Sequence, residues 1–161
     1  SVGIGHDTAE FAVASIRRWW QRLGRKRYDS PRRLFITADS GGSNSPRTRL
    51  WLSELQRFAD ETGMILEVSH YPPGTSKWNK IEHRLFCHIT RNWQGIPLET
   101  LEIVVNLIGS TKTKEGLEVH AWLDGRKYEK GRKVSNAEFA ELHIARNKFH
   151  GDWNYEIHPR S

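Results

Sequence analysis

Two short apolar runs, separated by an amphipathic stretch of helical length, constrain the fold of this chain more than any other feature. The runs occupy Arg33–Ala38 and Met64–His70, and both have the length and composition of buried strands. Apolar residues at helical spacing occupy 7–23, 46–62 and a stretch that begins near Ser76. A parallel strand pair needs a helical crossover of this kind between its strands. The sequence therefore predicts an α/β fold in which a parallel strand pair is flanked by helices.

Capping residues indicate the ends of the first two helices. Asp7 and Glu10 are spaced as a capping box, which predicts that the first helix begins at Asp7, and Gly24 is expected to end it. The second helix is expected to have Pro46 at its first position, where the missing N–H costs nothing. Gly63 is expected to close it, because glycine readily adopts the left-handed conformation that follows a helix.

The second half of the chain has a weaker pattern. A fourth helix is expected over 98–108 and a strand over 117–123. A serine–glutamate capping box that begins at Ser135 predicts a short helix over 135–144. Residues 145–161 show no periodic pattern and are expected to be irregular, although their aromatic side chains indicate that they pack.

Positive charge is concentrated near the amino-terminal end of the sequence. The 161 residues include 25 lysines and arginines and 19 aspartates and glutamates, which gives a net charge of +6. Between Arg17 and Arg33, eight basic residues accompany a single acid, Asp29. Such a cluster either binds phosphate groups or forms a solvated helix face and a charged loop, and the sequence leaves both interpretations open.

Other features exclude whole classes of protein. Seven tryptophans, four tyrosines and six phenylalanines argue against a long disordered chain, and Trp19 and Trp20 are expected in the core. The most apolar stretch, Leu101–Ile108, is far too short to cross a bilayer, so no membrane partner is expected. The single cysteine, Cys87, rules out an internal disulfide and a cysteine-based zinc cluster, and is expected to be a small buried residue. These features predict a globular cytoplasmic protein.

Two acidic residues occupy positions that suit metal chemistry. Asp39 directly follows the first strand and precedes a glycine-rich turn, and Glu82 lies in the first turns of the helix after the second strand. Ligand sites of open α/β sheets lie at the carboxyl ends of parallel strands, so the two carboxylates can converge. Paired carboxylates repel unless a cation lies between them, and Mg²⁺ accepts one or two carboxylates with several waters. The structural alternatives are a turn or helix cap for Asp39 and a solvated helix residue for Glu82.

The residues around both acids resemble the DDE transposases. Tyr71–His83 contains a proline turn followed by an Asn-x-Ile-Glu pattern that ends at Glu82, as in the segment that carries the last acid of many insertion-sequence and mariner-like enzymes. Leu34–Asp39, with the serine- and glycine-rich turn after it, resembles the segment that carries the second acid. From His6–Thr8 to Phe149–Tyr155, the chain is similar to the Rhodopirellula-type DDE transposase family of bacterial insertion sequences.

The resemblance implies an RNase H-like core that cuts and joins DNA with Mg²⁺ or Mn²⁺. By position, Asp39 and Glu82 would be the second and third metal ligands, and the family's first acid would lie upstream of this sequence. Asp7 is not expected to replace that acid, because the short interval before Asp39 leaves no room for the intervening strands. The chain is then expected to be the carboxy-terminal part of a transposase. It would have a partial RNase H-like core over 1–95 and a less regular α+β extension over 96–161 packed on that core.

The same resemblance implies that the partners are transposon ends and target DNA, in a bacterial cytoplasm and associated with the nucleoid. The expected DNA contacts are basic side chains of the arginine-rich stretch and of the Glu82 helix: Arg17, Arg18, Arg22, Lys77, Lys80 and His83. Without the first acid and its strand, the chain alone is expected to be inactive and to associate through the bare edge of its first strand. Alternative functions are a DNA-binding module without catalysis, an inactive relic of a mobile element, and a nuclease that hydrolyses but does not join strands.

Overall fold

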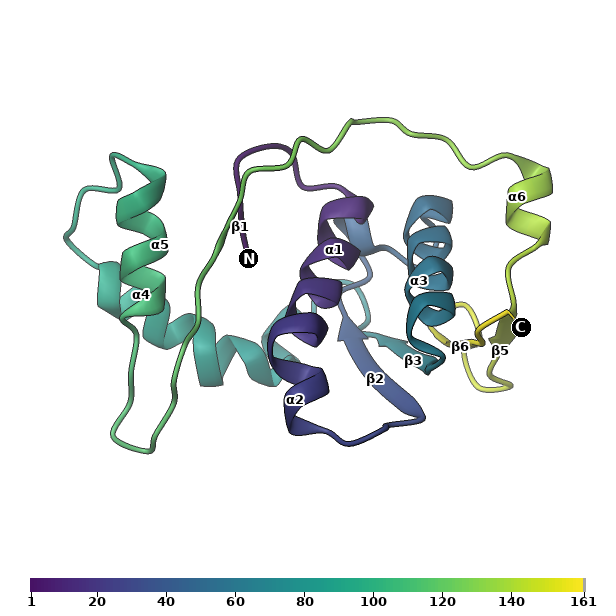
Figure 1. Cartoon of the computed structure of the whole chain (residues 1–161), viewed down its shortest axis with the longest axis horizontal. Helices are drawn as coiled ribbons and strands as arrows, with labels where there is room; N and C mark the ends of the chain where they lie inside the picture. Colours follow the sequence, from purple (N-terminus) through teal and green to yellow (C-terminus); the bar gives the residue numbers. More distant parts are fainter. Residues whose placement is uncertain (161) are drawn as a thin grey trace. The chain divides into compact units, whose positions relative to one another are not determined.

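The computed structural model describes residues 1–160 and contains two compact units (Figure 1). The sheet unit comprises residues 7–74 and the segment from Tyr128 onward, and the helical unit comprises residues 1–6 and 75–127. These compact units are not the same as the predicted domains, a core over 1–95 and an extension over 96–161. The domain bounds therefore stay a prediction.

The sheet unit is built on a four-stranded mixed sheet in the order β2-β3-β6-β5 (Figure 1). Its strands are β2 (Arg33–Ala38), β3 (Ile65–His70), β5 (Ile144–Arg146) and β6 (Asn154–Ile157). β2 and β3 run parallel in a register that pairs Ala38 with His70, which confirms the predicted parallel pair. β6 runs antiparallel to β3, and β5 runs antiparallel to β6. The expectation that the carboxy-terminal residues are irregular is therefore wrong, because they form a hairpin that extends the sheet.

β2 lies at an edge of the sheet and is less buried than the sequence predicts. Arg33, Phe35 and Thr37 are exposed, whereas Leu34 and Ile36 pack partly against the core. This alternation is typical of a strand with one covered and one open face. The apolar run is therefore an edge strand and not the buried strand that was expected. Among residues 1–160, one hydrogen-bonding edge of β2 has no strand partner.

The first helical segment begins later and runs further than the sequence predicts. Its consecutive parts are α1 (Ala9–Trp19), the π-helical turn η1 (Trp20–Gly24) and α2 (Arg25–Arg27). Thr8 and not Asp7 is the N-cap, because the Thr8 hydroxyl oxygen accepts the Phe11 N–H at 3.2 Å. Gly24 does not end the segment: a Cβ at this position would overlap the ring of Trp20, so glycine is required for close packing.

α3 (Arg49–Thr62) connects β2 to β3 and packs on the sheet. The short 3₁₀ turn η2 (Gly42–Asn44) and a turn that contains Pro46 precede it, so the helix begins later than expected, with Thr48 at the N-cap position. Gly63 ends the helix in the left-handed conformation, with a φ of 70°, as predicted.

The core of the sheet unit is formed by residues of the sheet and of the helices α1 and α3. Its largest apolar contributions are the fully buried side chains of Val13, Trp51, Leu52, Leu55, Phe58, Met64, Leu66, Val68, Tyr155 and Ile157. Full burial of one such apolar side chain contributes about 1.5–3 kcal/mol. Trp20 packs partly against this core, but Trp19 is 36% exposed, so the expectation that both tryptophans are core residues holds only for Trp20.

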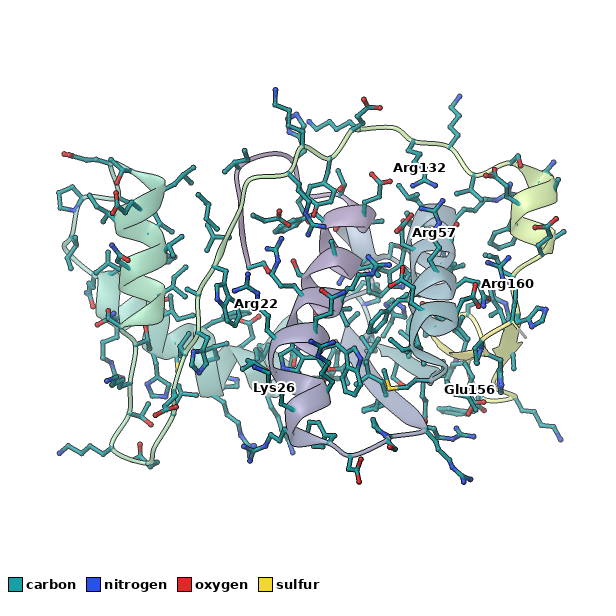
Figure 2. The ribbon with its side chains drawn as sticks, viewed as in Figure 1. Arg22, Lys26, Arg57, Arg132, Glu156 and Arg160 are labelled. Atoms are coloured by element: carbon teal, nitrogen blue, oxygen red, sulfur yellow. The ribbon has the colours of Figure 1, made fainter. Side chains whose placement is uncertain are left out.

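The segment that leads into β5 is attached to both helices of the sheet unit. Arg132, which Figure 2 labels, forms ion pairs with Glu10 of α1 and with Glu54 of α3. The short helix α6 (Asn136–Ala140) follows, and the predicted capping box at Ser135 is confirmed. Glu54 is buried and also pairs with Arg57 at 3.1 Å, so two arginines compensate its charge.

The helical unit contains short elements. They are β1 (Val2–Gly3), η3 (Ser76–Trp78), η4 (Glu82–Phe86), α4 (Cys87–Trp93), α5 (Leu101–Gly109) and β4 (Leu123–Asp124). β1 and β4 pair in parallel. The strand expected over 117–123 is wrong: β4 begins at Leu123, and an isolated bridge between Lys112 and Glu118 is the pairing described in the preceding residues.

Single side chains tie the helices of this unit together. The Asn92 amide donates to the Leu107 carbonyl at 2.6 Å, which connects α4 to α5. The expected fourth helix is present but begins later, with Thr100 as its N-cap. Cys87 is exposed and is not the buried residue that was expected. In the part of the chain that the structure describes, no helix has the length and apolar character needed to cross a membrane.

Candidate functional site

Asp39 lies at the carboxyl end of β2, next to the end of the parallel strand β3. It is exposed, and its carboxylate has no hydrogen-bond or ion-pair partner among residues 1–160. It does not cap a helix, because Gly41 and Thr48 hold the N-cap positions of η2 and α3. The interpretation of Asp39 as a helix cap is therefore wrong, and its carboxylate is available to a ligand.

The backbone of Asp39 is held by a buried network of side chains. His70 Nδ1 lies 2.9 Å from the Asp39 carbonyl oxygen, and His70 Nε2 lies 2.8 Å from the Tyr155 hydroxyl oxygen. The Trp51 indole N–H donates to the same hydroxyl at 2.9 Å. Burial lowers the pKa of His70 and raises the pKa of Tyr155, so both side chains are neutral near pH 7.

The turn after Asp39 is fixed at both of its ends. Before it, the Tyr71 N–H donates to the Ala38 carbonyl at 2.8 Å and so extends the contact between the two parallel strands. After it, the Ser43 hydroxyl donates to the Asp7 carboxylate at 2.9 Å. Asp7 therefore holds this turn and does not cap α1. The spacing of residues along the sequence did not indicate that Asp7 holds the turn.

Glu82 lies in the helical unit, as the first residue of the π-helical turn η4. The segment before it turns at Gly74, whose φ of 77° favours glycine, and the His83 ring Nε2 lies 2.8 Å from the Lys77 carbonyl oxygen. The Glu82 side chain is half-buried and has no hydrogen-bond or ion-pair partner within the described chain. Single π-helical turns are rare in proteins, and those that occur often lie at functional sites. The sequence predicted an ordinary α-helix here and gave no sign of the π-helical turn.

The two acids belong to different units, so their convergence stays a prediction. The described residues contain no group of three or more histidine, cysteine, aspartate or glutamate side chains that could hold a metal ion. A partner-free carboxylate nevertheless suits Mg²⁺, which takes oxygen ligands and keeps several waters. Each of the two carboxylates, taken by itself, has the oxygen chemistry that such an ion accepts.

The predicted DNA contacts are divided between the units. Those of the sheet unit are Arg17, Arg18 and Arg22, and those of the helical unit are Lys77, Lys80 and His83. Arg17 is already engaged, because its Nε and Nη2 donate to the Glu61 carboxylate at 2.6 and 3.0 Å. Its guanidinium also lies 5.8 Å from the centroid of the Phe58 ring. Arg17 therefore contributes to the contact between α1 and α3, whereas Lys77 and Lys80 are exposed.

A further group of cations lines a pocket of about 440 Å³ within the helical unit. Its lining, here called the cationic pocket, consists of His88, Arg91, Asn92, Thr111, Lys112, Thr113, Lys114 and Glu115. Within the described residues, no ion pair joins Arg91, Lys112 or Lys114 to an acid, although Glu115 lines the same pocket. Sequence reasoning missed this group, because its cations come from α4 and from a distant loop and form no run.

The motif at 149–155 forms the turn of the β5–β6 hairpin and the start of β6. The Trp153 N–H donates to the His150 carbonyl at 2.8 Å and closes the turn. A Cβ on Gly151 would lie 2.5 Å from a backbone carbonyl oxygen of the same turn, so glycine is required there. Tyr155 is 1% exposed and joins the network at His70. The motif thus places Tyr155 in contact with the residue that holds Asp39.

Comparison with known proteins gives one family. The family model described as "Rhodopirellula transposase DDE domain" matches residues 1–159. No curated protein and no solved structure matches the chain.

Proposed function

The chain belongs to the Rhodopirellula transposase DDE domain family, and on this premise we propose that Asp39 and Glu82 contribute to a metal-dependent site that cuts and joins DNA. Family membership implies DNA transposition, with DNA as the partner. The proposal is supported above all by the partner-free Asp39 carboxylate at the carboxyl end of β2 in the described residues. Ligands of open α/β sheets bind at this end of the strands.

Asp39 and Glu82 would hold the divalent ion, Mg²⁺ or Mn²⁺, through carboxylate oxygens. When bound, paired ions of this kind activate the attacking oxygen and stabilise the leaving oxygen in phosphodiester chemistry. Asp39 presents an exposed carboxylate on a backbone fixed by the sheet, so little further ordering is needed when a ligand binds. Glu82 is the first residue of the π-helical turn η4, a kind of turn that often occurs at functional sites.

We assign the first acid of the site to a part of the transposase outside these residues. The free edge of β2 supports this assignment, because another strand can pair there. The described residues also contain no group of three metal-ligating side chains. Asp7 is a poor substitute, since its carboxylate accepts the Ser43 hydroxyl. On this assignment the chain alone is inactive, and self-association through the β2 edge is expected.

DNA would be bound through its phosphates by both units. Around the cationic pocket, the like charges of Arg91, Lys112 and Lys114 repel one another unless an anion enters, and a phosphodiester supplies that anion. Lys77 and Lys80 precede Glu82 and would hold the phosphate near the metal. The remaining proposed contacts are Arg17, Arg18, Arg22 and His83. Action on transposon ends and target DNA would place the protein in the bacterial cytoplasm, in association with the nucleoid.

A role in DNA binding without catalysis is the second candidate. The cationic pocket favours it, because that pocket is complete within the helical unit whereas the metal site is not complete within the described residues. The two candidates differ in whether Asp39 is needed for strand cleavage.

The deciding experiment compares variants of the full-length transposase on a labelled transposon-end duplex with Mn²⁺. Asp39→Asn and Glu82→Gln are expected to lose strand cleavage by more than the ~10–100-fold that follows changes around metal ligands, and to keep DNA binding. Asp7→Asn is the matched control and is expected to keep cleavage. Normal cleavage by Asp39→Asn would contradict the metal-ligand assignment. DNA binding without cleavage by the unmodified transposase would favour the second candidate.

A further inference from the structure

A series of three hydrogen bonds, two of them buried, leads from α3 to the backbone of Asp39. Trp51 of α3 contacts Tyr155 of β6 at 2.9 Å, and Tyr155 contacts His70 at the end of β3 at 2.8 Å. His70 in turn contacts the Asp39 carbonyl oxygen at 2.9 Å. Trp51 and Tyr155 are each 1% exposed and His70 is 5% exposed, so water does not replace the two bonds among these side chains.

The chemistry at the two ends of this series fixes the direction of every hydrogen bond in it. An indole N–H only donates and a carbonyl oxygen only accepts. Trp51 therefore donates to the Tyr155 oxygen, and His70 Nδ1 carries the proton that it donates to the Asp39 carbonyl. In the neutral imidazole, Nε2 then has no proton and accepts the Tyr155 hydroxyl hydrogen. One neutral tautomer of His70 satisfies all three bonds.

We infer that His70 is a positioning residue of the metal site, because its Nδ1–H bond sets the orientation of the Asp39 peptide and thereby the direction of the Asp39 carboxylate. The inference rests on the proposed function, in which Asp39 is a metal ligand. Without this bond, the nearest remaining bonds that hold the backbone around Asp39 would be the one between Tyr71 and Ala38 before it and the one between Ser43 and Asp7 after it. The turn that follows contains Gly41 and Gly42, which restrict the backbone little.

The consequence for metal binding follows from how accurately a ligand must be placed. Ligating groups have to be held within about 0.5 Å of their productive position. Loss of a group that orients a metal ligand costs ~10–100-fold in metal affinity or activity. Trp51 and Tyr155 belong to the packed core of the sheet unit and fix the position of the His70 ring. The rigidity of this core therefore restrains Asp39 through the His70 imidazole.

Two substitutions of similar shape separate the two ring nitrogens of His70. In His70→Asn, the side-chain amide N–H takes the position of Nδ1–H and keeps the bond to Asp39. In His70→Gln, the longer amide reaches the position of Nε2 and keeps only the bond to Tyr155. Both variants are made in the full-length transposase, and Mn²⁺ affinity, strand cleavage and the midpoint of thermal unfolding are measured.

Both variants are expected to unfold at a lower temperature, because each loses one of the three hydrogen bonds. His70→Asn is expected to bind Mn²⁺ and cleave DNA close to the parent level. His70→Gln is expected to lose ~10–100-fold in Mn²⁺ affinity and cleavage. A merely structural role for His70 would lower stability in both variants and leave their Mn²⁺ affinities equal.

Asp39→Asn separates failure of this inference from failure of the proposed function. If Asp39→Asn leaves Mn²⁺ affinity unchanged, the metal site itself is wrong and the positioning role is wrong with it. If Asp39→Asn abolishes Mn²⁺ binding while the two His70 variants behave alike, only the positioning role is overturned. Nitrogen NMR of the imidazole in the unmodified protein does not depend on the folding of any variant: a proton on Nδ1 is expected, and a proton on Nε2 alone overturns the inference.

Discussion

The two units of the molecule differ in how they bury their apolar residues. Among the described residues, Ile89 is the one buried hydrophobic side chain of the helical unit, whereas the sheet unit has a continuous core. Most of the large exposed hydrophobic residues belong to the helical unit: Ile4, Trp78, Ile81, Phe86, Ile96, Leu98, Leu101 and Leu123. Few buried apolar contacts mean low local stability. Asp39 and Glu82 are therefore held by scaffolds of different strength.

The difference in burial is tested most directly by a matched pair of leucines. Leu55 is 0% exposed in the sheet unit and Leu101 is 44% exposed in the helical unit. Leu55→Ala is expected to lower the free energy of unfolding by about 2–5 kcal/mol, because it leaves a cavity in the core. Leu101→Ala is expected to change it by less than about 0.5 kcal/mol. Urea unfolding measures both, and equal losses would mean that the helical unit has a core of its own.

A pair of glycines sharpens the same comparison at the level of the backbone. Gly151→Ala is expected to cost about 1–3 kcal/mol, because the new Cβ would lie 2.5 Å from a carbonyl oxygen of the β5–β6 turn. Gly125 in the helical unit has open space around its Cβ position, so Gly125→Ala is the control. Thermal unfolding measures both, and an unchanged midpoint for Gly151→Ala would show that the hairpin turn adapts.

Much of the sheet unit could be predicted from the sequence, because its elements are long enough to carry a pattern. The bounds of β2 agree with the apolar run Arg33–Ala38, and Gly63 ends α3 as expected. β5 and β6 could not be predicted, because strands of three and four residues show no period. Asp7 was predicted as the N-cap because aspartate is a preferred residue there, but the neighbouring Thr8 caps the helix and Asp7 accepts a hydrogen bond from the distant Ser43.

The candidate site was predictable only where its residues are marked by local context. Asp39 follows a strand and precedes a turn, and both positions are visible in the sequence. Its contact with His70 links residues 31 positions apart, and the contact of His70 with Tyr155 links residues 85 positions apart. No local pattern encodes such pairs, because packing of the sheet brings them together. The same reason hides the cationic pocket.

Each unit carries its own cations, so the two units can also be compared by which of them binds DNA. One triple alanine variant changes the helical unit at Arg91, Lys112 and Lys114. The other changes the sheet unit at Arg17, Arg18 and Arg22. Removal of each cation that binds a phosphate is expected to reduce the slope of log affinity against log salt by about 0.9. Fluorescence anisotropy with duplex DNA measures both slopes.

The helical-unit variant is expected to change this slope more than the sheet-unit variant, because Arg17 already pairs with Glu61. If the sheet-unit variant alone changes the slope, the DNA surface lies on the well-packed unit. The helical unit would then have to be assigned another partner for its exposed apolar residues.

The smallest expected effect concerns the ion pair between Arg160 and Asp60, here called the clamp, which holds the carboxy-terminal segment on α3. Partial burial by itself would raise the pKa of Asp60, but hydrogen bonds from Arg160 outweigh it and hold that pKa below its usual value near 3.8 (Figure 2 labels Arg160). The Arg160 Nη2 and backbone N–H lie 2.7 and 2.8 Å from the Asp60 carboxylate. Because the folded-state pKa is lowered, the contribution of Asp60 is fully present above its unfolded pKa and is lost as pH falls through the folded pKa.

Asp60→Asn is expected to cost about 0.2–1 kcal/mol at neutral pH, as for a mostly accessible ion pair, and nothing at pH values where Asp60 is protonated. Urea unfolding of both proteins from neutral pH to about pH 3 measures the difference, and the two curves are expected to converge at the acid end. Asp152→Asn is the control, because the Asp152 side chain is 90% exposed and its contact with Arg146 is 3.5 Å long. Hydrogen exchange at acid pH is expected to increase in the segment from Tyr128 onward and to leave the helical unit unchanged, since the clamp belongs to the sheet unit alone. An equal increase in both units would show that they share one stability.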